Sequence, residues 1–165
     1  MAQNNQALLT RLKGSGLEFV VIGGVCAVYH GAAVATFDLD ICCPFGEENM
    51  RRIEVAVQDL HPVHRLTAHK LPLETTRSAF ASLKNLYLQT DLGKLDCLSE
   101  VAGLGKFEAV LAQSTAANFG FGEFRLLSLD ALIAAKTAVG REKDLEAVRL
   151  LQAIKERKAQ QKDLF

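Results

Sequence analysis

The sequence predicts an α/β fold, with a mixed β-sheet and helices packed on it. One reason is size, because 165 residues suit one domain and 49% of them are hydrophobic, which is enough to build a core. Another is that short runs rich in β-branched residues alternate with longer runs of helical apolar spacing. Neither a repeat nor a linker interrupts the sequence. We therefore expect one domain over residues 1–165, with a C-terminal helical segment from about residue 128.

The period of the apolar residues predicts which segments are helices and which are strands. Residues 47–60 show helical spacing, with two glutamates at the end where the helix dipole favours acids. Ser128 is a suitable N-cap, and Gly140 a suitable end, for a helix between them. The sequence Asp91-Leu92-Gly93 predicts a hairpin turn, whereas residues 61–82 have no clear period. We expect helices over residues 3–13, 25–30, 47–60, 107–113, 129–139 and 141–157, and strands over residues 17–22, 37–43, 83–90, 94–98 and 121–127.

Two acidic residues, Asp38 and Asp40, stand one residue apart in a short apolar segment. Side chains alternate along a strand, so both carboxylates face one side, and Phe37, Leu39 and Ile41 face the other. Like charges this close repel each other unless a cation lies between them. Paired carboxylates suit Mg²⁺, which binds oxygen ligands together with substrate phosphates. A solvated acidic pair on an edge strand is the alternative.

A third acid, Asp96, is centred in the second strand of the expected hairpin. If this strand lies beside the one that carries Asp38, all three carboxylates reach the same metal ions. A third acid can complete the coordination and serve as general base. An exposed strand acid without a ligand is the alternative for Asp96.

A glycine pair, Gly23-Gly24, separates the first expected strand from a short helix. Glycine lets the backbone approach a ligand closely, and a helix N-terminus favours anions. The pair is therefore a candidate phosphate site, although a tight turn alone also explains it.

Charge and hydropathy narrow the class of protein. The formal net charge is zero and the pI is about 6.9, which argues against a protein that mainly coats nucleic acid. Residues 136–162 are nonetheless mildly basic. No secretory signal is recognisable at the N-terminus. Glycines interrupt the uncharged stretch 19–37, which we therefore expect to form a strand, a turn and a short helix rather than a membrane span.

The histidines and cysteines give no strong metal signal. His61, His64 and His69 form a loose cluster, but their spacing does not repeat on a helix, which disfavours a zinc site. The cysteines lack metal-finger spacing and lie in apolar segments, which predicts buried thiols and a cytoplasmic location. These cysteines are Cys26, Cys42, Cys43 and Cys97.

Several ordered motifs together resemble the polymerase-β-like nucleotidyltransferase superfamily, and more narrowly its small bacterial stand-alone members, which are related to minimal nucleotidyltransferases and abortive-infection toxins. The resemblance covers roughly residues 17–151. The motifs are Gly23-Gly24, His30-Gly31, Thr36-Phe37-Asp38-Leu39-Asp40, the segment Thr90 to Asp96, the segment Leu129 to Lys136, and the segment Gly140 to Asp144.

This resemblance implies a nucleotidyltransferase-like fold and a reaction. Such enzymes hold a Mg²⁺-bound nucleoside triphosphate on the glycine turn, and an acceptor hydroxyl attacks the α-phosphorus while pyrophosphate leaves. Two Mg²⁺ ions would be held by Asp38, Asp40 and Asp96, and Asp96 would help to deprotonate the acceptor. The resemblance assigns the nucleotide to Gly23, Gly24, Thr36, Lys136, Arg141 and Lys143. Solvated helix charges are the alternative for the last three.

One departure from the family pattern leaves the activity open. Relatives often carry an arginine just before the threonine of the acidic motif, where this chain has Val34 and Ala35. The alternative function is therefore a catalytically inactive binding or regulatory module, for example of a toxin–antitoxin-type pair with an operon-encoded partner. A metal-dependent phosphodiesterase with the same acids is a further alternative. The acceptor, whether protein, RNA or small molecule, is left open by the sequence, although zero net charge slightly disfavours RNA.

Overall fold

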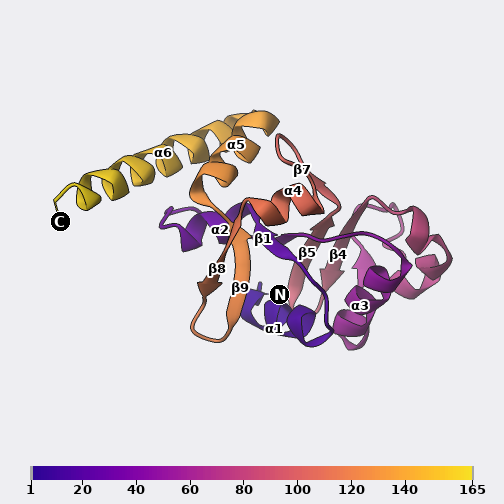
Figure 1. Ribbon diagram of the computed structural model, residues 1–165. Helices are drawn as coiled ribbons and strands as arrows, with labels where there is room; N and C mark the ends of the chain where they lie inside the picture. The colour runs from indigo at the N-terminus through magenta and orange to yellow at the C-terminus, as the bar shows by residue number, and fades with distance from the viewer. Residues whose placement is uncertain (1, 165) are drawn as a thin grey trace.

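The computed structural model describes residues 2–164 and contains a seven-stranded mixed sheet (Figure 1). The strand order is β3-β4-β5-β2-β1-β9-β8, with β1/β9 and β2/β5 parallel and the other pairs antiparallel. A separate two-stranded sheet joins β6 to β7. The strands are β1 (Val20–Ile22), β2 (Leu39–Cys42), β3 (Val63–His64), β4 (Asn85–Thr90), β5 (Gly93–Leu98), β6 (Glu100–Val101), β7 (Gly105–Lys106), β8 (Ser114–Asn118) and β9 (Glu123–Leu127).

The helices follow the predicted pattern closely. They are α1 (Asn5–Gly14), α2 (Gly23–Tyr29), α3 (Glu47–Val57), α4 (Phe107–Ala112), α5 (Leu129–Val139) and α6 (Glu142–Lys162), with 3₁₀ helices η1 (Gln58–Leu60) and η2 (Leu73–Ser82). The predicted α/β class with a mixed sheet and packed helices is confirmed. The hairpin of β4 and β5 also forms where the turn residues predicted it.

Three predicted elements need correction. The first strand begins at Val20 rather than at residue 17, and α6 continues to Lys162, beyond the predicted end near residue 157. The second strand begins only at Leu39, so Phe37 does not share the core face but is 72% exposed. The edge strand β8 was not predicted, because its alanine-rich sequence has no β-branched apolar run, and pairing with β9 creates it.

The sheet face opposite the acids is buried in the core. Alternation along paired strands puts Val21, Ile41 and Cys97 on this face, and all three are fully buried. The leucines of α1 and the apolar face of α3 are buried in the same core. The uncharged stretch 19–37 is built into β1, α2 and the following loop. Within residues 2–164, no helix has both the length and the apolar character needed to cross a membrane.

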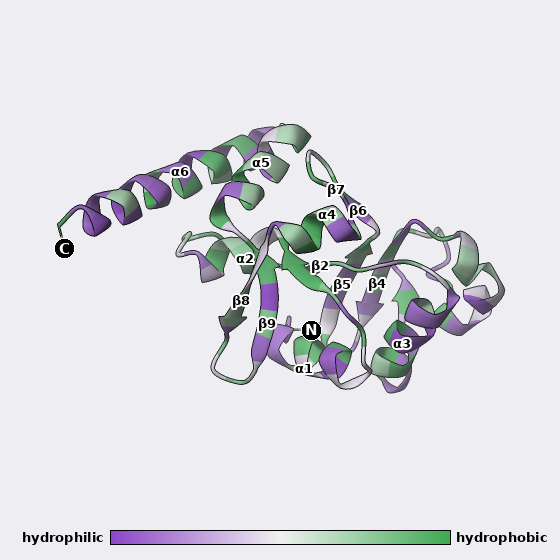
Figure 2. Ribbon diagram, in the orientation of Figure 1, coloured by the Kyte–Doolittle hydropathy of each residue, from purple (hydrophilic) through white to green (hydrophobic). Residues whose placement is uncertain are grey.

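The last two helices form the C-terminal helical segment. Ser128 caps α5 by accepting a hydrogen bond from the backbone N–H of Ala131 at 3.2 Å, and Gly140 ends the helix in a left-handed conformation with φ of 70°. Helix α6 then packs against α5 and runs outward to the C-terminus (Figure 1). Its hydropathy alternates along its length, because only one side faces the rest of the protein (Figure 2).

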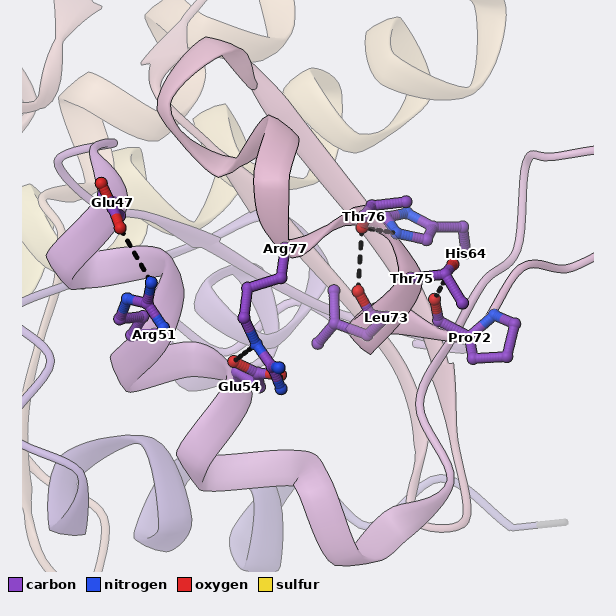
Figure 3. Close-up of polar contacts among 9 residues, drawn as sticks. All are labelled: Glu47, Arg51, Glu54, His64, Pro72, Leu73, Thr75, Thr76 and Arg77. Carbon is purple, nitrogen blue, oxygen red and sulfur yellow. Dashed lines mark hydrogen bonds and ion pairs between the residues drawn. The ribbon is translucent and has the colours of Figure 1, made fainter.

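Residues 61–82, which we call the arm, connect η1 to β4. They form β3 and the ten-residue helix η2. Arg77 of η2 forms an ion pair with Glu54, a buried carboxylate of α3, and its Nε donates to Glu54 Oε1 at 3.0 Å (Figure 3). His64 contacts the hydroxyl of Thr76 at 2.7 Å (Figure 3). The arm is therefore fixed to α3 at one end and folded back on itself at the other.

Candidate active site

Three carboxylates from two neighbouring strands converge at one point on the sheet. Strands β2 and β5 are parallel, and their register makes Asp40 and Asp96 direct partners. Asp38 precedes β2 by one residue, and because it is two residues from Asp40 it points to the same side. One oxygen from each of the three lies within 4.8 Å of the others. The structure thus brings together the three acids predicted from the sequence, which we call the triad.

The electrostatics of the triad favour a cation. Burial, with the neighbouring charges of Asp38 and Asp96, raises the pKa of Asp40 to about 7. Burial also raises the pKa of Asp96, although a hydrogen bond from Arg65 opposes this. Three oxygen donors at this separation, with a surplus of negative charge, are a suitable ligand set for Mg²⁺. The residues present therefore fit the ion that the sequence resemblance implies.

Position 23 requires glycine because the side chain of Asp40 lies directly against it. Gly23 has a φ of +66°, a conformation that side-chain-bearing residues rarely adopt. A Cβ at this position would lie 2.8 Å from Cγ of Asp40 and still nearer to its Oδ2. Helix α2 begins at Gly23 itself, so the predicted turn before the helix is instead the first helical turn.

Gly24 and Thr36 are neighbours across the entrance to α2. A Cβ at Gly24 would lie 2.8 Å from Cγ2 of Thr36. Both residues line the large cleft that contains the triad. The glycine pair therefore serves the packing around the acids as well as leaving its backbone open to the cleft.

The cleft has a volume of about 1370 Å³ and extends to both sides of the triad. Helices α2, α5 and α6 form one wall, which carries the predicted basic residues Lys136, Arg141 and Lys143. Strands β4 and β5 and the arm form the other, whereas the β6–β7 hairpin lies against α5, where a Cβ at Gly103 would be 2.7 Å from Cβ of Ala138. Every residue that the sequence assigned to the nucleotide or metal thus lines this one cleft: Gly23, Gly24, Thr36, Asp38, Asp40, Asp96, Lys136, Arg141 and Lys143. Val34 and Ala35, at the positions of the missing arginine, line it too.

Asp144 is a cleft residue that the sequence did not single out for a role. It is buried in the first turn of α6 and accepts a hydrogen bond from Nε of Arg141 at 2.6 Å. The ammonium of Lys136 lies 4.0 Å from its other oxygen. Burial opposes ionisation of Asp144, but the basic neighbours outweigh it and hold its pKa below the ordinary value. Asp144 therefore holds two basic side chains on the wall of the cleft formed by α2, α5 and α6.

Arg65 is the second cleft residue that was missed. It lies directly after β3 in the arm, and its Nε donates to Asp96 Oδ1 at 3.2 Å. Its position depends on the pairing of β3 with β4, which the aperiodic sequence of the arm did not predict. No local signal in the sequence therefore marks Arg65.

The histidines and cysteines lie outside the triad. Among the described residues, His61 pairs with Asp91 and His64 contacts Thr76, so these two histidines of the loose cluster have different partners. His30 lies 2.8 Å from the carbonyl oxygen of Leu127, at the end of β9. The predicted burial of the cysteines is confirmed for Cys26, Cys42, Cys43 and Cys97.

Comparison with known proteins supports the fold. No protein-family model and no curated protein matches the sequence. Among solved structures, a protein of Thermotoga maritima proposed to be a nucleotidyltransferase is similar over 86% of each chain, with 18% identity and a TM-score of 0.53. The lincosamide antibiotic adenylyltransferase LnuA, solved with lincomycin, is similar over 92% of this chain and 98% of its own, with 14% identity and a TM-score of 0.59.

A third structure is the complex of ANT(2'')-Ia with adenylyl-2''-tobramycin. It is similar over 93% of this chain and 91% of its own, with 17% identity and a TM-score of 0.53. The similarity to these three structures extends over 86–93% of the chain described here. The protein therefore has a nucleotidyltransferase-like fold, as the sequence motifs predicted.

Proposed function

We propose that the protein transfers a nucleoside monophosphate from a nucleoside triphosphate to a hydroxyl-bearing acceptor, with Mg²⁺ as cofactor. The observation that carries the proposal is the convergence of Asp38, Asp40 and Asp96 within 4.8 Å, beside the glycine pair, in a cleft of about 1370 Å³. The structural neighbours include two adenylyltransferases, which supports the same class of reaction.

The triad would hold the metal ions. Asp38 and Asp40 would hold two Mg²⁺ ions between them, with Asp96 as a further ligand, and the close approach of the three carboxylates supports this assignment. When bound, Mg²⁺ neutralises charge on the triphosphate and so stabilises negative charge that develops during transfer. Burial and the charges of Asp38 and Asp96 raise the pKa of Asp40, so a bound cation would favour the charged form of this carboxylate.

In the proposed reaction, the acceptor oxygen forms a bond to the α-phosphorus as the bond to the bridging oxygen of pyrophosphate breaks. The proton of the acceptor hydroxyl passes to a carboxylate, for which Asp96 on the β4–β5 side of the triad is our candidate. The electron pair of the broken bond leaves with pyrophosphate. The chain's contribution is mainly to position the reactants and to balance charge.

The nucleotide would lie along the wall of the cleft that α2, α5 and α6 form. Gly23, Gly24 and Thr36 offer a close backbone approach there, and Lys136, Arg141 and Lys143 supply positive charge for the phosphates. Asp144 would keep Lys136 and Arg141 in place in the free protein. This arrangement leaves the wall of β4, β5 and the arm for the acceptor.

A binding or regulatory module without turnover is the second candidate. The observation that favours it is that Val34 and Ala35, both cleft residues, are apolar where the family resemblance expects an arginine. A partner protein encoded in the same operon, as in toxin–antitoxin pairs, would then respond to nucleotide binding. This candidate predicts nucleotide binding without release of pyrophosphate.

The test is a transfer assay with each of the four triphosphates labelled at the α-phosphorus, Mg²⁺, and pools of protein, RNA and antibiotic acceptors. The label should become attached to one acceptor, with pyrophosphate released in equal amount, and Asp38→Asn should abolish both. If pyrophosphate is never released although the wild type binds nucleotide, the binding module is the correct account. Release of nucleoside monophosphate into water, without labelled acceptor, would instead indicate a hydrolase.

A further inference from the structure

Arg65 binds a carboxylate of the triad through two hydrogen bonds. Its Nε donates to Asp96 Oδ1 at 3.2 Å, and its Nη2 donates to Asp96 Oδ2, so that each carboxylate oxygen accepts one hydrogen bond. This is the paired geometry in which arginine binds a carboxylate most strongly. The side chain of Asp96 is 9% exposed and that of Arg65 22%, so solvent weakens the pair little.

The position of Arg65 is fixed by several separate contacts. Tyr87 is the direct cross-strand partner of Asp96, and the Arg65 guanidinium lies over the Tyr87 ring, 5.4 Å from its centroid. The backbone N–H of Arg65 donates to the carbonyl oxygen of Tyr87 at 3.0 Å. One tyrosine thus anchors both the main chain and the side chain of Arg65.

The rest of the arm supports the same placement. His64, the neighbouring residue, contacts Thr76 at 2.7 Å, and its backbone N–H donates to the carbonyl oxygen of Leu71 at 2.8 Å. The arm is held to α3 by Arg77 and Glu54 (Figure 3). Arg65 is therefore a built part of the cleft rather than a mobile surface side chain.

We propose that Arg65 is the resident counter-ion of the triad, a positioning residue that holds Asp96 in the metal-free protein and competes with free divalent cations for it. This inference rests on the proposed function. The guanidinium takes one lone pair on each Asp96 oxygen and adds a positive charge next to the site, and this charge opposes the binding of a second cation. Free Mg²⁺ therefore binds weakly, and the ion enters most favourably with the triphosphate, whose own negative charge compensates for Arg65.

The contact leaves part of the guanidinium unused. Arginine has five N–H donors, and Asp96 takes one from Nε and one from Nη2. Arg65 lines the cleft on the wall that we assign to the hydroxyl-bearing substrate, so its remaining N–H groups can donate to that substrate. When the metal–nucleotide complex engages Asp96, Arg65 stays beside it as a source of positive charge and hydrogen bonds for the reacting groups.

The experiment compares the binding of Mn²⁺ alone, used as a Mg²⁺ substitute, in the wild type, Arg65→Gln and Arg65→Lys. Removal of a unit positive charge in contact with a metal ligand should tighten Mn²⁺ binding by about fivefold or more in Arg65→Gln. Arg65→Lys, which keeps the charge but loses the paired geometry, should lie between the two. Arg51→Gln is the matched control, because Arg51 forms an exposed ion pair on α3 and does not line the cleft.

The same variants are then tested with the Mn²⁺ complex of a non-hydrolysable triphosphate. Arg65→Gln should lose its advantage there, because the negative charge of the triphosphate offsets the positive charge that Arg65 adds in the wild type. A purely structural role for Arg65 predicts weaker binding of both ligands, and unchanged or weaker Mn²⁺ binding in Arg65→Gln overturns the proposal.

If Arg65→Gln does not fold, Arg65→Lys is used in its place, and Mn²⁺ binding by Arg65→Lys that is no tighter than that of the wild type overturns the proposal. If neither the wild type nor the variants bind Mn²⁺, the counter-ion proposal fails together with the metal site. If the variants differ as expected but no nucleotide is transferred to any acceptor, only the proposed function is contradicted.

Discussion

Asp40 and Asp96 are direct partners in the parallel pairing of β2 with β5, so two acids 56 positions apart in the sequence are adjacent on one face of the sheet. Asp38 joins them from the residue before β2, and one oxygen of each lies within 4.8 Å of the others. This relationship turns separate sequence motifs into one cation site.

Asp40→Asn should stabilise the metal-free protein, in a manner that depends on pH. The pKa of Asp40 rises from 3.8 to about 7 on folding, so between these values the folded chain holds a proton that the unfolded chain has released. The stability contributed by that proton is therefore present at low pH and lost as pH rises through about 7. Thermal melts of the metal-free proteins at pH 5 and pH 8 should show a larger gain for Asp40→Asn at pH 8. An equal gain at both values would mean that Asp40 is not the titrating group.

Gly23→Ala should destabilise the fold and disturb the triad. The residue has a positive φ, and the new Cβ would meet the Asp40 carboxylate, so we expect a loss of about 2 kcal/mol or more. Denaturant unfolding measures the loss, and Gly14→Ala is the control, because a Cβ there meets nothing within 4 Å. Equal stability of the two variants would contradict the close approach of Gly23 and Asp40.

Asp144→Asn should weaken nucleotide binding more than it weakens metal binding. It removes the charge that holds Lys136 and Arg141, and a buried partner of this kind contributes about 2–4 kcal/mol to stability. Equilibrium binding of a triphosphate and chemical unfolding are the two measurements. Asp130→Asn, which removes an exposed pair with Lys155, is the control and should change stability by less than about 1 kcal/mol. If Asp144→Asn binds the triphosphate with the affinity of the wild type, Asp144 does not position Lys136 and Arg141 for the nucleotide.

Arg77→Ala should loosen the arm and, through it, Arg65. It leaves the carboxylate of Glu54 buried without its partner, which should lower the free energy of unfolding. Hydrogen exchange should then be faster across residues 61–82, including the backbone N–H of Arg65. Arg51→Ala, which breaks only an exposed pair, should leave both stability and exchange nearly unchanged. If hydrogen exchange over residues 61–82 is equally fast in Arg77→Ala and Arg51→Ala, the Arg77–Glu54 pair does not anchor the arm.

Local sequence signals predicted most of the elements that position the acids. Ser128 and Gly140 mark the two ends of α5, and the turn at residues 91–93 places Asp96 in a hairpin strand, because capping and turn chemistry act over a few residues. The expected convergence of the three acids required β2 to lie beside β5, and the structure contains this pairing.

The remaining cleft residues depend on contacts that a linear sequence does not display. Arg65 reaches Asp96 only because β3 pairs with β4, and β3 is two residues long. Asp144 reads as an ordinary acid at a helix start, and its role follows from burial against Lys136 and Arg141. Phe37 was misplaced because the strand begins two residues later than the apolar pattern suggested, which leaves its ring exposed beside the cleft.

The most direct test of the account is a crystal structure of the protein with Mg²⁺ and a non-hydrolysable nucleoside triphosphate. We expect Mg²⁺ bound to Asp38, Asp40 and Asp96, with the triphosphate between the glycine pair and the basic residues of α5 and α6. A nucleotide bound elsewhere, or a triad without metal and with Arg65 still on both oxygens of Asp96 at saturating ligand, would contradict it.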